Sequence, residues 1–347
     1  MKHPSRFTSL ALLLVLSLSG CDFVDNLAGG DDTPDAVGLF PVLLDGSWGY
    51  INANGRMIIE PHLQEARPFI EGVAHVKINW KHCYIDPSGE VVITPRYEDA
   101  RDFSEGLAAV RIDGRWGFVD HAGAWIINPQ FTSANSFSEG RAFVRTSSYE
   151  WNYIDKRGNI IRSTNTPDLQ EVEDHRFSNG LALVRDRENN YGYIDKQGEP
   201  VIPLQYSSAG PFSDGRAAIK ISDRWGYILK DQRTAISPQY ISAGPFEEGL
   251  APVRKDGNTW GYIDESGQLA INADFDEARP FSNGLAAVQK NGRWGYVNTR
   301  GAYVLSPEYD TVYDFENGLG RIRLDVGDAQ KYGYVDGAGQ FVWYPTN

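Results

Sequence analysis

The sequence predicts an all-β fold made of nine tandem units of about 34 residues. The first observation is a Trp-Gly pair that returns at a nearly constant step. The pair occurs at Trp48, Trp116, Trp225, Trp260 and Trp294, with degenerate copies at His82-Cys83, Trp151-Asn152, Tyr191-Gly192 and Tyr332-Gly333. Neighbouring copies are 34 or 35 residues apart, except for two longer steps of 40 and 38 residues. A period in this range indicates a repeat architecture.

A second landmark keeps the same register, so the repeat does not depend on one motif. It is a Phe-x-x-Gly sequence that begins at Phe69, Phe103, Phe137, Phe177, Phe212, Phe246, Phe281 and Phe315. The third observation is that no unit shows a helical periodicity of apolar residues, whereas each shows short apolar runs between turn signals. We therefore expect strands and turns throughout.

The clearest copy of the unit, residues 106–127, predicts three strands. The first is the apolar run 107–112, and Asp113-Gly114 after it is a hairpin turn signal. The second strand is 116–120, and it ends in an Asp-x-x-Gly turn. The third strand is 125–127, and Pro129 ends it.

Side chains alternate between the two faces of a strand, so Trp116 and Phe118 share a face. We expect this Trp, the aromatic residue after its Gly, and the Phe of Phe-x-x-Gly to stack from unit to unit as ladders in the core. We expect Gly117 to allow the close approach of a neighbouring unit.

The arrangement of the units has two candidates. A propeller blade usually has about 40–45 residues and four strands, and a closed ring usually holds about 4–8 blades. The unit here is shorter, with three predicted strands, and there are nine of them. We therefore expect an open solenoid or superhelix of β-hairpin units, with a β-propeller as the alternative.

The N-terminus predicts export. Lys2 and Arg6 precede an apolar run from Leu10 to Leu18, which is too short for a permanent membrane span. The following Leu18-Ser-Gly-Cys21 resembles the lipobox of bacterial lipoproteins. That resemblance implies a signal peptide over residues 1–20 and lipid attachment to Cys21, and Asp22 resembles a signal for retention in the inner membrane.

The predicted domain boundaries follow from this N-terminus. Residues 21–37, from the lipidated Cys21 onward, are acidic and contain Gly and Pro, which is typical of a disordered tether. Residues 38–347 form the repeat domain. Removing residues 1–20 moves the formal net charge from −13 to −15, because it takes away Lys2 and Arg6 and no acid. This charge disfavours nucleic-acid binding. Cys83 would then be the one free thiol, which leaves no partner for an intramolecular disulfide.

The repeat unit resembles the bacterial WG-repeat family over residues 38–344. The resemblance rests on runs such as Trp260-Gly-Tyr-Ile-Asp264 and Phe281-Ser-Asn-Gly-Leu-Ala286. It implies a repeat fold and no particular activity, because the family carries no common chemistry.

Catalytic motifs are absent from the sequence. It contains no metalloprotease motif, nucleophile elbow, phosphate loop or dinucleotide fingerprint. We expect no catalytic residue, no cofactor and no metal site. His82-Cys83 has the residue types of a metal site, but it replaces the Trp-Gly pair of its unit, so we interpret it as a degenerate copy with a small buried thiol.

Three polar columns run through the repeat. The first is the Asp that opens the Asp-x-x-Gly turn, where an Asp side chain caps its own backbone. The second is a basic row that follows the Val or Ile of the first strand, and it is our candidate ligand face: Lys77, Arg111, Arg145, Arg185, Lys220, Arg254 and Arg323. The third is mainly acidic: Glu71, Glu105, Glu139, Asp214 and Glu248, with Asn in three units. The last two columns form either a solvated face of interleaved charges or a docking row for an anionic partner or glycan.

We expect a periplasm-facing, membrane-anchored lipoprotein of the bacterial cell envelope that binds or scaffolds a protein or polysaccharide partner and is not an enzyme. One rival is a repeat-scaffold enzyme acting on envelope polysaccharide, which would need a pair of close carboxylates. The other is a passive surface spacer.

Overall fold

The computed structural model describes residues 38–147, 150–161, 169–170, 172, 174–327 and 329–346. These residues lie within one compact unit, residues 34–347. The predicted signal peptide and tether, residues 1–37, lie outside the described residues, so lipid attachment to Cys21 stays a prediction. In the described ranges, no helix is long and apolar enough to cross a membrane.

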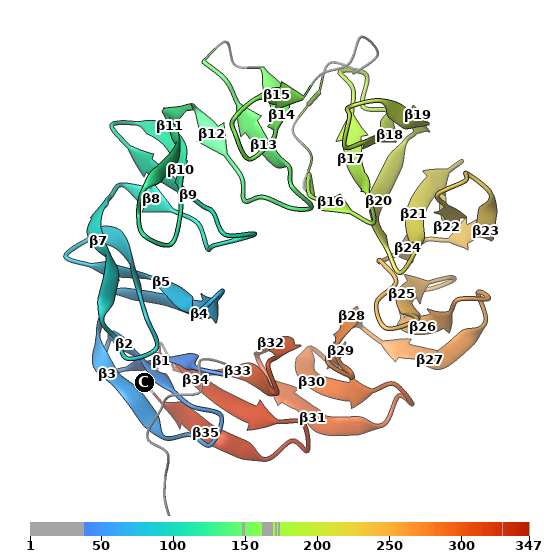
Figure 1. Ribbon diagram of the computed structural model, residues 1–347. Helices are drawn as coiled ribbons and strands as arrows, with labels where there is room; N and C mark the ends of the chain where they lie inside the picture. The colour runs from blue at the N-terminus through green and yellow to red at the C-terminus, as the bar shows by residue number, and fades with distance from the viewer. Residues whose placement is uncertain are drawn as a thin grey trace, which may run out of the picture. The chain divides into compact units, whose positions relative to one another are not determined.

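The described residues form nine antiparallel sheets that follow one another around a ring, as a nine-bladed β-propeller (Figure 1). The first sheet has three strands and each of the other eight has four. The prediction of an all-β repeat fold is confirmed. Of the two arrangements considered, the structure has the propeller, and the preference for an open solenoid was wrong.

The strands of each blade follow one another from the inside of the ring to the outside, as shown in Figure 1. Blade 1 contains β1 (Phe40–Leu44), β2 (Ser47–Ile51) and β3 (Met57–Leu63). Blade 2 contains β4 (Glu65–Ile70), β5 (Val73–Ile78), β6 (Lys81–Ile85) and β7 (Val91–Tyr97). Blade 3 contains β8 (Asp99–Ala100), β9 (Ala108–Ile112), β10 (Arg115–Val119) and β11 (Trp125–Phe131). Blade 4 contains β12 (Ser133–Ala134), β13 (Ala142–Arg145), β14 (Trp151–Ile154) and β15 (Ile160–Ile161). Blade 5 contains β16 (Phe177–Ser178), β17 (Leu181–Arg185), β18 (Tyr191–Asp195) and β19 (Pro200–Tyr206).

The remaining four blades repeat the same pattern. Blade 6 contains β20 (Ser208–Ser213), β21 (Arg216–Ile221), β22 (Arg224–Leu229) and β23 (Thr234–Tyr240). Blade 7 contains β24 (Ser242–Ala243), β25 (Leu250–Arg254), β26 (Trp260–Asp264) and β27 (Leu269–Phe275). Blade 8 contains β28 (Glu277–Ser282), β29 (Leu285–Lys290), β30 (Arg293–Asn298) and β31 (Tyr303–Tyr309). Blade 9 contains β32 (Thr311–Glu316), β33 (Leu319–Val326), β34 (Ala329–Asp336) and β35 (Phe341–Thr346).

A fourth, innermost strand explains why the units form a propeller. It lies just before or within the Phe-x-x-Gly segment, where the sequence indicated only a connection. In blade 3 it is the two-residue β8, and the Arg101 amide extends the pairing by donating to the Ala109 carbonyl at 2.9 Å. Such short strands carry little periodicity, so the sequence pattern did not reveal them. With them, each complete unit has the four strands of a propeller blade.

The aromatic ladder exists, but its members differ from those predicted. The aromatic residue after Trp-Gly packs its ring against the Phe of the next Phe-x-x-Gly, with centroids 4.8 to 5.9 Å apart. Both rings are buried in nearly every pair. The Trp residues at the Trp-Gly positions are half-buried instead, except for the buried Trp116. The ladder therefore consists of Tyr and Phe, and the Trp side chains flank it.

The Gly of the Trp-Gly pair serves its own sheet rather than a neighbouring unit. A Cβ on Gly117 would lie 2.5 Å from the Ile127 carbonyl oxygen and 2.8 Å from the Pro129 nitrogen, both on the adjacent outer strand. The register between β10 and β11 shifts at this point, between the pairs Trp116–Phe131 and Phe118–Ile127. Gly is therefore required by a β-bulge, and the predicted approach of a neighbouring unit was wrong.

The ring closes where blade 9 meets blade 1, a place we call the seam. The Tyr334 hydroxyl donates to the Pro41 carbonyl at 2.8 Å, and the Tyr334 ring lies 5.5 Å from Phe40. In other blades, the residue that corresponds to Phe40 in the strand register is small, as are Ala74, Ala217 and Gly320. Each of these small residues pairs with the Phe of the innermost strand of its blade. Phe40 thus fills the space of a Phe that the three described strands of blade 1 do not supply.

Candidate binding surfaces at the hairpin rim and the seam

The predicted basic row lies on one rim of the ring. Each of its residues stands next to the hairpin that joins the second and third strands of its blade, so the row is spread around the ring and does not converge. We call this surface the hairpin rim, and it consists of those hairpins, for example residues 45–46, 79–80, 113–114, 222–223 and 291–292.

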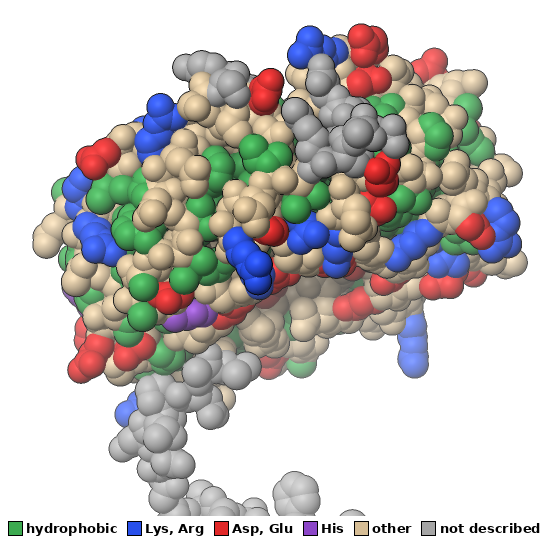
Figure 2. All heavy atoms as spheres, turned by 45° about the horizontal axis from the view of Figure 1, so that its top comes forward, with side chains coloured by type: hydrophobic (Ala, Val, Ile, Leu, Met, Phe, Trp, Pro, Cys, Tyr) green, Lys and Arg blue, Asp and Glu red, His purple; other side chains and the backbone are tan. Residues whose placement is uncertain are grey.

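The basic side chains are engaged within their own blades. The ion pairs are Lys77–Glu65 at 3.0 Å, Arg111–Glu98 at 3.4 Å, Lys220–Asp223 at 3.5 Å and Arg323–Asp325 at 3.1 Å. The guanidinium groups of Arg145, Arg185 and Arg254 lie 5.6 to 6.0 Å from the ring centres of Trp151, Tyr191 and Trp260. On the face drawn in Figure 2, basic and acidic side chains are likewise interleaved. The row therefore contributes contacts within the seven blades that carry it, and it is not a patch of one sign.

Trp80 lies at the tip of the hairpin in blade 2. From the sequence, a Trp outside the Trp-Gly pairs is expected to be an additional core residue more often than an exposed stacking platform, and for Trp80 that expectation is wrong. Its side chain is 78% exposed, and its backbone has a φ of 62°. Several other units place Gly at this turn position, as at Gly46, Gly114 and Gly292, where positive φ has no steric cost, whereas blade 6 has Asp223 there with a φ of 65°. Trp80 combines an exposed aromatic ring with an unfavourable backbone conformation, and the signal was a Trp where the repeat has Gly.

The Asp column has the local role that the sequence indicated. In each Asp-x-x-Gly turn, one carboxylate oxygen accepts from the amides two and four residues later, as Asp120 does from Ala122 at 3.0 Å and Ala124 at 2.9 Å. The hydrogen bonds from the Ser266 hydroxyl and the Gln268 amide lower the pKa of Asp264. The prediction that these residues cap their own turns is confirmed by these contacts.

The acidic column has a role that the sequence did not reveal, because its side chains join neighbouring blades. Each carboxylate accepts from the amide of the matching Gly in the next blade. The oxygen-to-nitrogen distance is 2.9 Å for each of Glu71–Gly106, Glu105–Gly140, Glu139–Gly180, Asp214–Gly249 and Glu248–Gly284. Partial burial raises the pKa of Glu139, but hydrogen bonds from Lys196 and the Gly180 amide outweigh it and hold the pKa below its usual value. We call these contacts the turn brackets.

Two adjoining cavities of about 360 and 240 Å³ lie at the seam and share Pro41, Pro68 and Arg321. The larger is also lined by Trp48, Arg67, Asp102 and Tyr332. The Arg321 guanidinium lies 3.9 Å from the ring centre of Tyr313 and 5.5 Å from that of Tyr332. Among the described residues, no ion pair of Arg321 is shorter than 4 Å, but Glu316 lines the smaller cavity with it. Burial and the nearby Asp314 raise the pKa of Glu316, and the Arg321 guanidinium opposes that shift.

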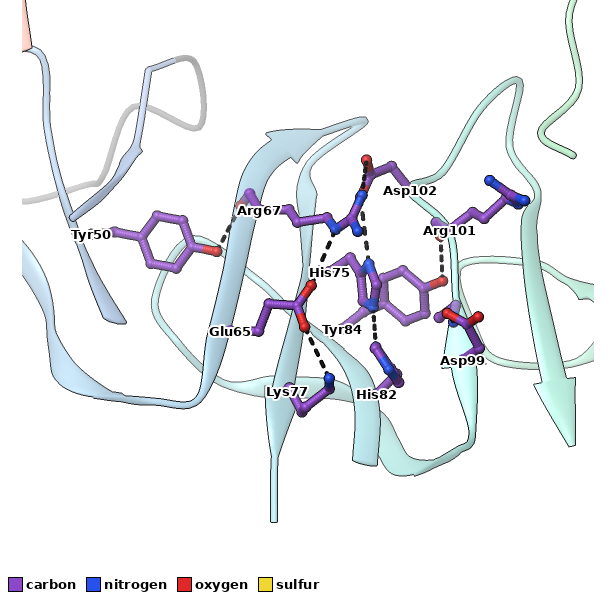
Figure 3. A network of polar contacts seen from close by, with 11 residues as sticks. Tyr50, Glu65, Arg67, His75, Lys77, His82, Tyr84, Asp99, Arg101 and Asp102 are labelled. Carbon is purple, nitrogen blue, oxygen red and sulfur yellow. Dashed lines mark hydrogen bonds and ion pairs between the residues drawn. The ribbon is translucent and has the colours of Figure 1, made fainter. Parts of the chain in front are cut away.

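A buried histidine pair lies beside the larger cavity (Figure 3). His75 and His82 are 2% and 8% exposed, and His75 Nε2 lies 2.7 Å from His82 Nδ1. On its other side, His75 Nδ1 is 3.6 Å from Asp102, which is longer than a hydrogen bond. Burial and the nearby His75 lower the pKa of His82. The sequence did not reveal this pair, because it joins residues on adjacent strands.

Cys83 follows the histidine pair and faces the core. Burial raises the pKa of its thiol to about 11, which leaves it protonated and unreactive at neutral pH. Within the described part of the chain, no group of three or more His, Cys, Asp or Glu side chains is placed to hold a metal ion.

The fold and its repeated contacts define a β-propeller built from tandem units with a Trp-Gly core motif. The model of the WG containing repeat family matches residues 48–81, 84–116, 116–148, 191–225, 225–258, 260–294 and 294–325, which is more than half of the chain. The chain belongs to this family. No match was found among curated proteins.

Solved structures share the fold at low sequence identity. The crystal structure of a eukaryotic initiation factor is similar with a TM-score of 0.62 and 8% identity, over 89% of this chain and 96% of that chain. BamB from Moraxella catarrhalis is similar with a TM-score of 0.44 and 14% identity, over 82% of this chain and 93% of that chain. The first of these supports the propeller fold and carries no information on function.

Proposed function

We propose that this protein is a non-catalytic binding module of the bacterial cell envelope that docks a protein partner on its hairpin rim. A lipid on Cys21 would hold it at the membrane, facing the periplasm. The observation that carries the docking proposal is Trp80. A left-handed conformation costs a non-Gly residue about 1–2 kcal/mol, and here the residue also exposes a large aromatic ring. Strain of this kind persists where function uses it.

The rest of the hairpin rim supports a protein partner. Ile221 and Val326 lie on the same rim and are 46% and 56% exposed. Exposed aromatic residues dominate the binding energy of protein interfaces, and partly exposed charges around them add specificity. The basic row supplies such charges, each already oriented by an acid or a ring of its own blade. A rim that combines these features fits a protein surface better than it fits a uniform polyanion.

The test is affinity capture from envelope extract with the full-length protein and its Trp80→Gly variant. Gly is the residue that sibling units have at this position, so the variant should fold at least as stably as the wild-type protein. We expect the wild type to retain a specific protein and the variant to retain at least tenfold less of that protein. An Ile126→Thr variant, which changes an exposed residue on the outer strand β11, is the control and should retain the partner.

Capture of the same protein by the Trp80→Gly variant would contradict docking through the hairpin rim. Retention on peptidoglycan or surface polysaccharide alone, tested in parallel, would instead favour a wall-binding module. In that case the basic row becomes the target, and reversal of Arg111, Arg145 and Arg185 to Glu should release the polymer. If the protein retains neither a protein nor a polysaccharide, the passive spacer and the repeat-scaffold enzyme become the hypotheses to test.

A further inference from the structure

Blade 2 combines three departures from the repeat in one hairpin, residues 75–82. His75 and His82 stand where blade 3 has Ala and Trp, and Trp80 stands at the tip, where several blades have Gly. Within the described residues, the buried side chains that are polar or charged are His75, His82 and Asn152. Two of these three lie in the hairpin that carries the exposed Trp80, which indicates that the pair acts on that hairpin.

The histidine pair lies at the base of this hairpin. In the register of β5 and β6, His82 is opposite Lys77. One further pair of residues separates it from the turn, which Asn79 and Trp80 form with φ of 51° and 62°. His82 is therefore only two residues from Trp80, and a displacement of His82 would be transmitted directly to the tip of the hairpin.

The contact between the two rings has room for a single hydrogen atom. His75 Nε2 and His82 Nδ1 are 2.7 Å apart, so one of them donates and the other must accept. A neutral pair meets this condition, and so does a pair that has taken up one proton. When both imidazoles are protonated, each facing nitrogen carries a hydrogen atom, and the contact has to break.

The surroundings of the pair favour a first proton and oppose a second. The charged groups near it in Figure 3 are Lys77 on β5, Arg67 and Glu65 on β4, and Arg101, Asp99 and Asp102 in and after β8. Asp102 lies 3.6 Å from His75 Nδ1 and so offsets a first proton. Burial, His75 and Lys77 lower the pKa of His82 and so oppose a second proton, and Asp99 and Glu65 act against this shift. Tyr84, which packs on His75, stays neutral because burial raises the pKa of its hydroxyl.

We propose that this histidine pair is a pH switch for docking on the hairpin rim, which holds Trp80 in its docking position at neutral pH and releases it in acid. The second proton breaks the contact between the rings. His75 is 2% exposed and packs on Tyr84, so His82, which is nearer the turn, is the ring that moves. The partner binds while His82 is neutral and is lost as His82 becomes protonated, below pH 6.5. This inference rests on the proposed docking through Trp80 and describes its regulation.

Fluorine NMR of the full-length protein labelled with 5-fluorotryptophan follows the tip of the hairpin without any partner. The chain has nine Trp residues, and the resonance of Trp80 is the one absent from the Trp80→Gly variant. We expect this resonance to move between pH 7.5 and pH 5, with a midpoint below pH 6.5, and to return when the pH is raised again. The resonances of the Trp residues in other blades should stay in place, because the movement is confined to one hairpin.

The matched variants are His82→Gln and His62→Gln. The Gln side chain at position 82 can still accept a hydrogen bond from His75 and takes no proton, so the Trp80 resonance should keep its neutral position down to pH 5. His62 is exposed on β3, and its variant should keep the wild-type response. His75→Ala, which introduces the residue of blade 3, removes the facing ring and should also abolish the movement. Circular dichroism at each pH checks that every variant is folded.

The same variants test the effect on the partner, in affinity capture from envelope extract that is bound at pH 7.5 and washed at pH 5. One linked proton changes an affinity by at most about tenfold per pH unit, and we expect the wild type to keep roughly fivefold less of the partner at pH 5 than at pH 7.5. The His82→Gln variant should keep the partner at both pH values, and His62→Gln should lose it as the wild type does.

Three results would overturn the switch. The first is a Trp80 resonance that stays in place in the wild type or moves equally in His82→Gln, whether or not a partner is captured. The second is a movement of all Trp resonances together, which would show that acid loosens the whole ring. The third is a partner that is captured through Trp80 and retained at pH 5, which would leave docking intact. If the resonance moves as expected and no protein is captured, the movement of the hairpin is upheld and docking on the hairpin rim is refuted.

Discussion

The tyrosine that follows the Trp-Gly pair joins each blade to the next in two ways. Its ring packs on the next Phe, and its hydroxyl donates to a carbonyl of the next inner strand, as Tyr262 does to Arg279 at 2.7 Å. Burial raises the pKa of Tyr262, so the hydroxyl stays protonated and donates over the whole physiological range. Phe118 lacks the hydroxyl and keeps the ring contact. The ring is thus the constant part of the interaction, and the hydrogen bond is added to it.

The buried histidine pair should make the stability of the protein depend on pH near neutrality. Because the pKa of His82 is lowered below 6.5 by burial and by His75, the unfolded chain binds a proton more readily than the folded chain. Lys77 adds to this effect, whereas Asp99 and Glu65 oppose it. Stability from this pair is fully present above pH 6.5 and is lost as the pH falls toward the folded pKa.

We predict that the melting temperature falls between pH 7 and pH 5.5 in the wild type and falls less in the double variant His75→Ala, His82→Trp. These are the residues that blade 3 has at the same positions, Ala109 and Trp116. Thermal unfolding followed by circular dichroism at several pH values gives the comparison. Parallel curves for the two proteins would show that the pair does not couple to folding.

At the scale of the strand, the ladder residues should contribute more to the free energy of unfolding than the Trp side chains beside them. Phe281 is 2% exposed and packs on Tyr262, whereas Trp260 is half-buried beside the ladder. We predict that Phe281→Ala destabilises the protein by about 3–5 kcal/mol and that Trp260→Ala costs roughly half as much. Urea unfolding of both variants measures the difference. A larger loss for Trp260→Ala would restore the Trp-centred ladder that the sequence indicated.

The turn brackets should weaken in acid. The pKa of Glu139 is lowered in the folded state, so its contribution is present above the unfolded value of about 4.3 and is lost as the pH falls through the folded pKa. We predict that Glu139→Gln is less stable than the wild type at pH 7 and that the two converge in acid. Glu150→Gln, at an exposed residue, is the control and should behave as the wild type at every pH. Acid unfolding monitored by fluorescence measures the stability difference between the wild type and Glu139→Gln. A difference that persists at low pH would show that the Glu139 carboxylate does not stabilise the turn bracket.

The strands that a periodic pattern can reveal were predictable, and the contacts between blades were not. The hairpin of residues 107–120 was predictable, because its apolar run, Asp-Gly turn and Trp-Gly strand are all local signals. The two-residue strand β8 and the bracket from Glu105 to Gly140 depend on a neighbour in space, and nothing local marks them. Trp80 could have been found as a departure from the repeat, because a Trp stood where sibling units have Gly.

At the scale of the whole molecule, closure depends on a departure from the repeat. Blade 1 has three described strands, and Phe40 and Tyr334 together replace the contact that an inner-strand Phe makes elsewhere. Closure brings Arg321 of blade 9 and Arg67 of blade 2 to one cavity, although they are far apart in the sequence. An open solenoid would keep these two residues apart, and this shared cavity would not form.

Small-angle X-ray scattering of the full-length protein tests this closure most directly. A compact chain of this length has a radius of gyration of about 20 Å. We predict a value near this, raised slightly by the residues before the ring, and a pair-distance distribution with one compact maximum. A clearly larger radius with an elongated distribution would mean that the nine units form an open array, which would contradict the closed ring.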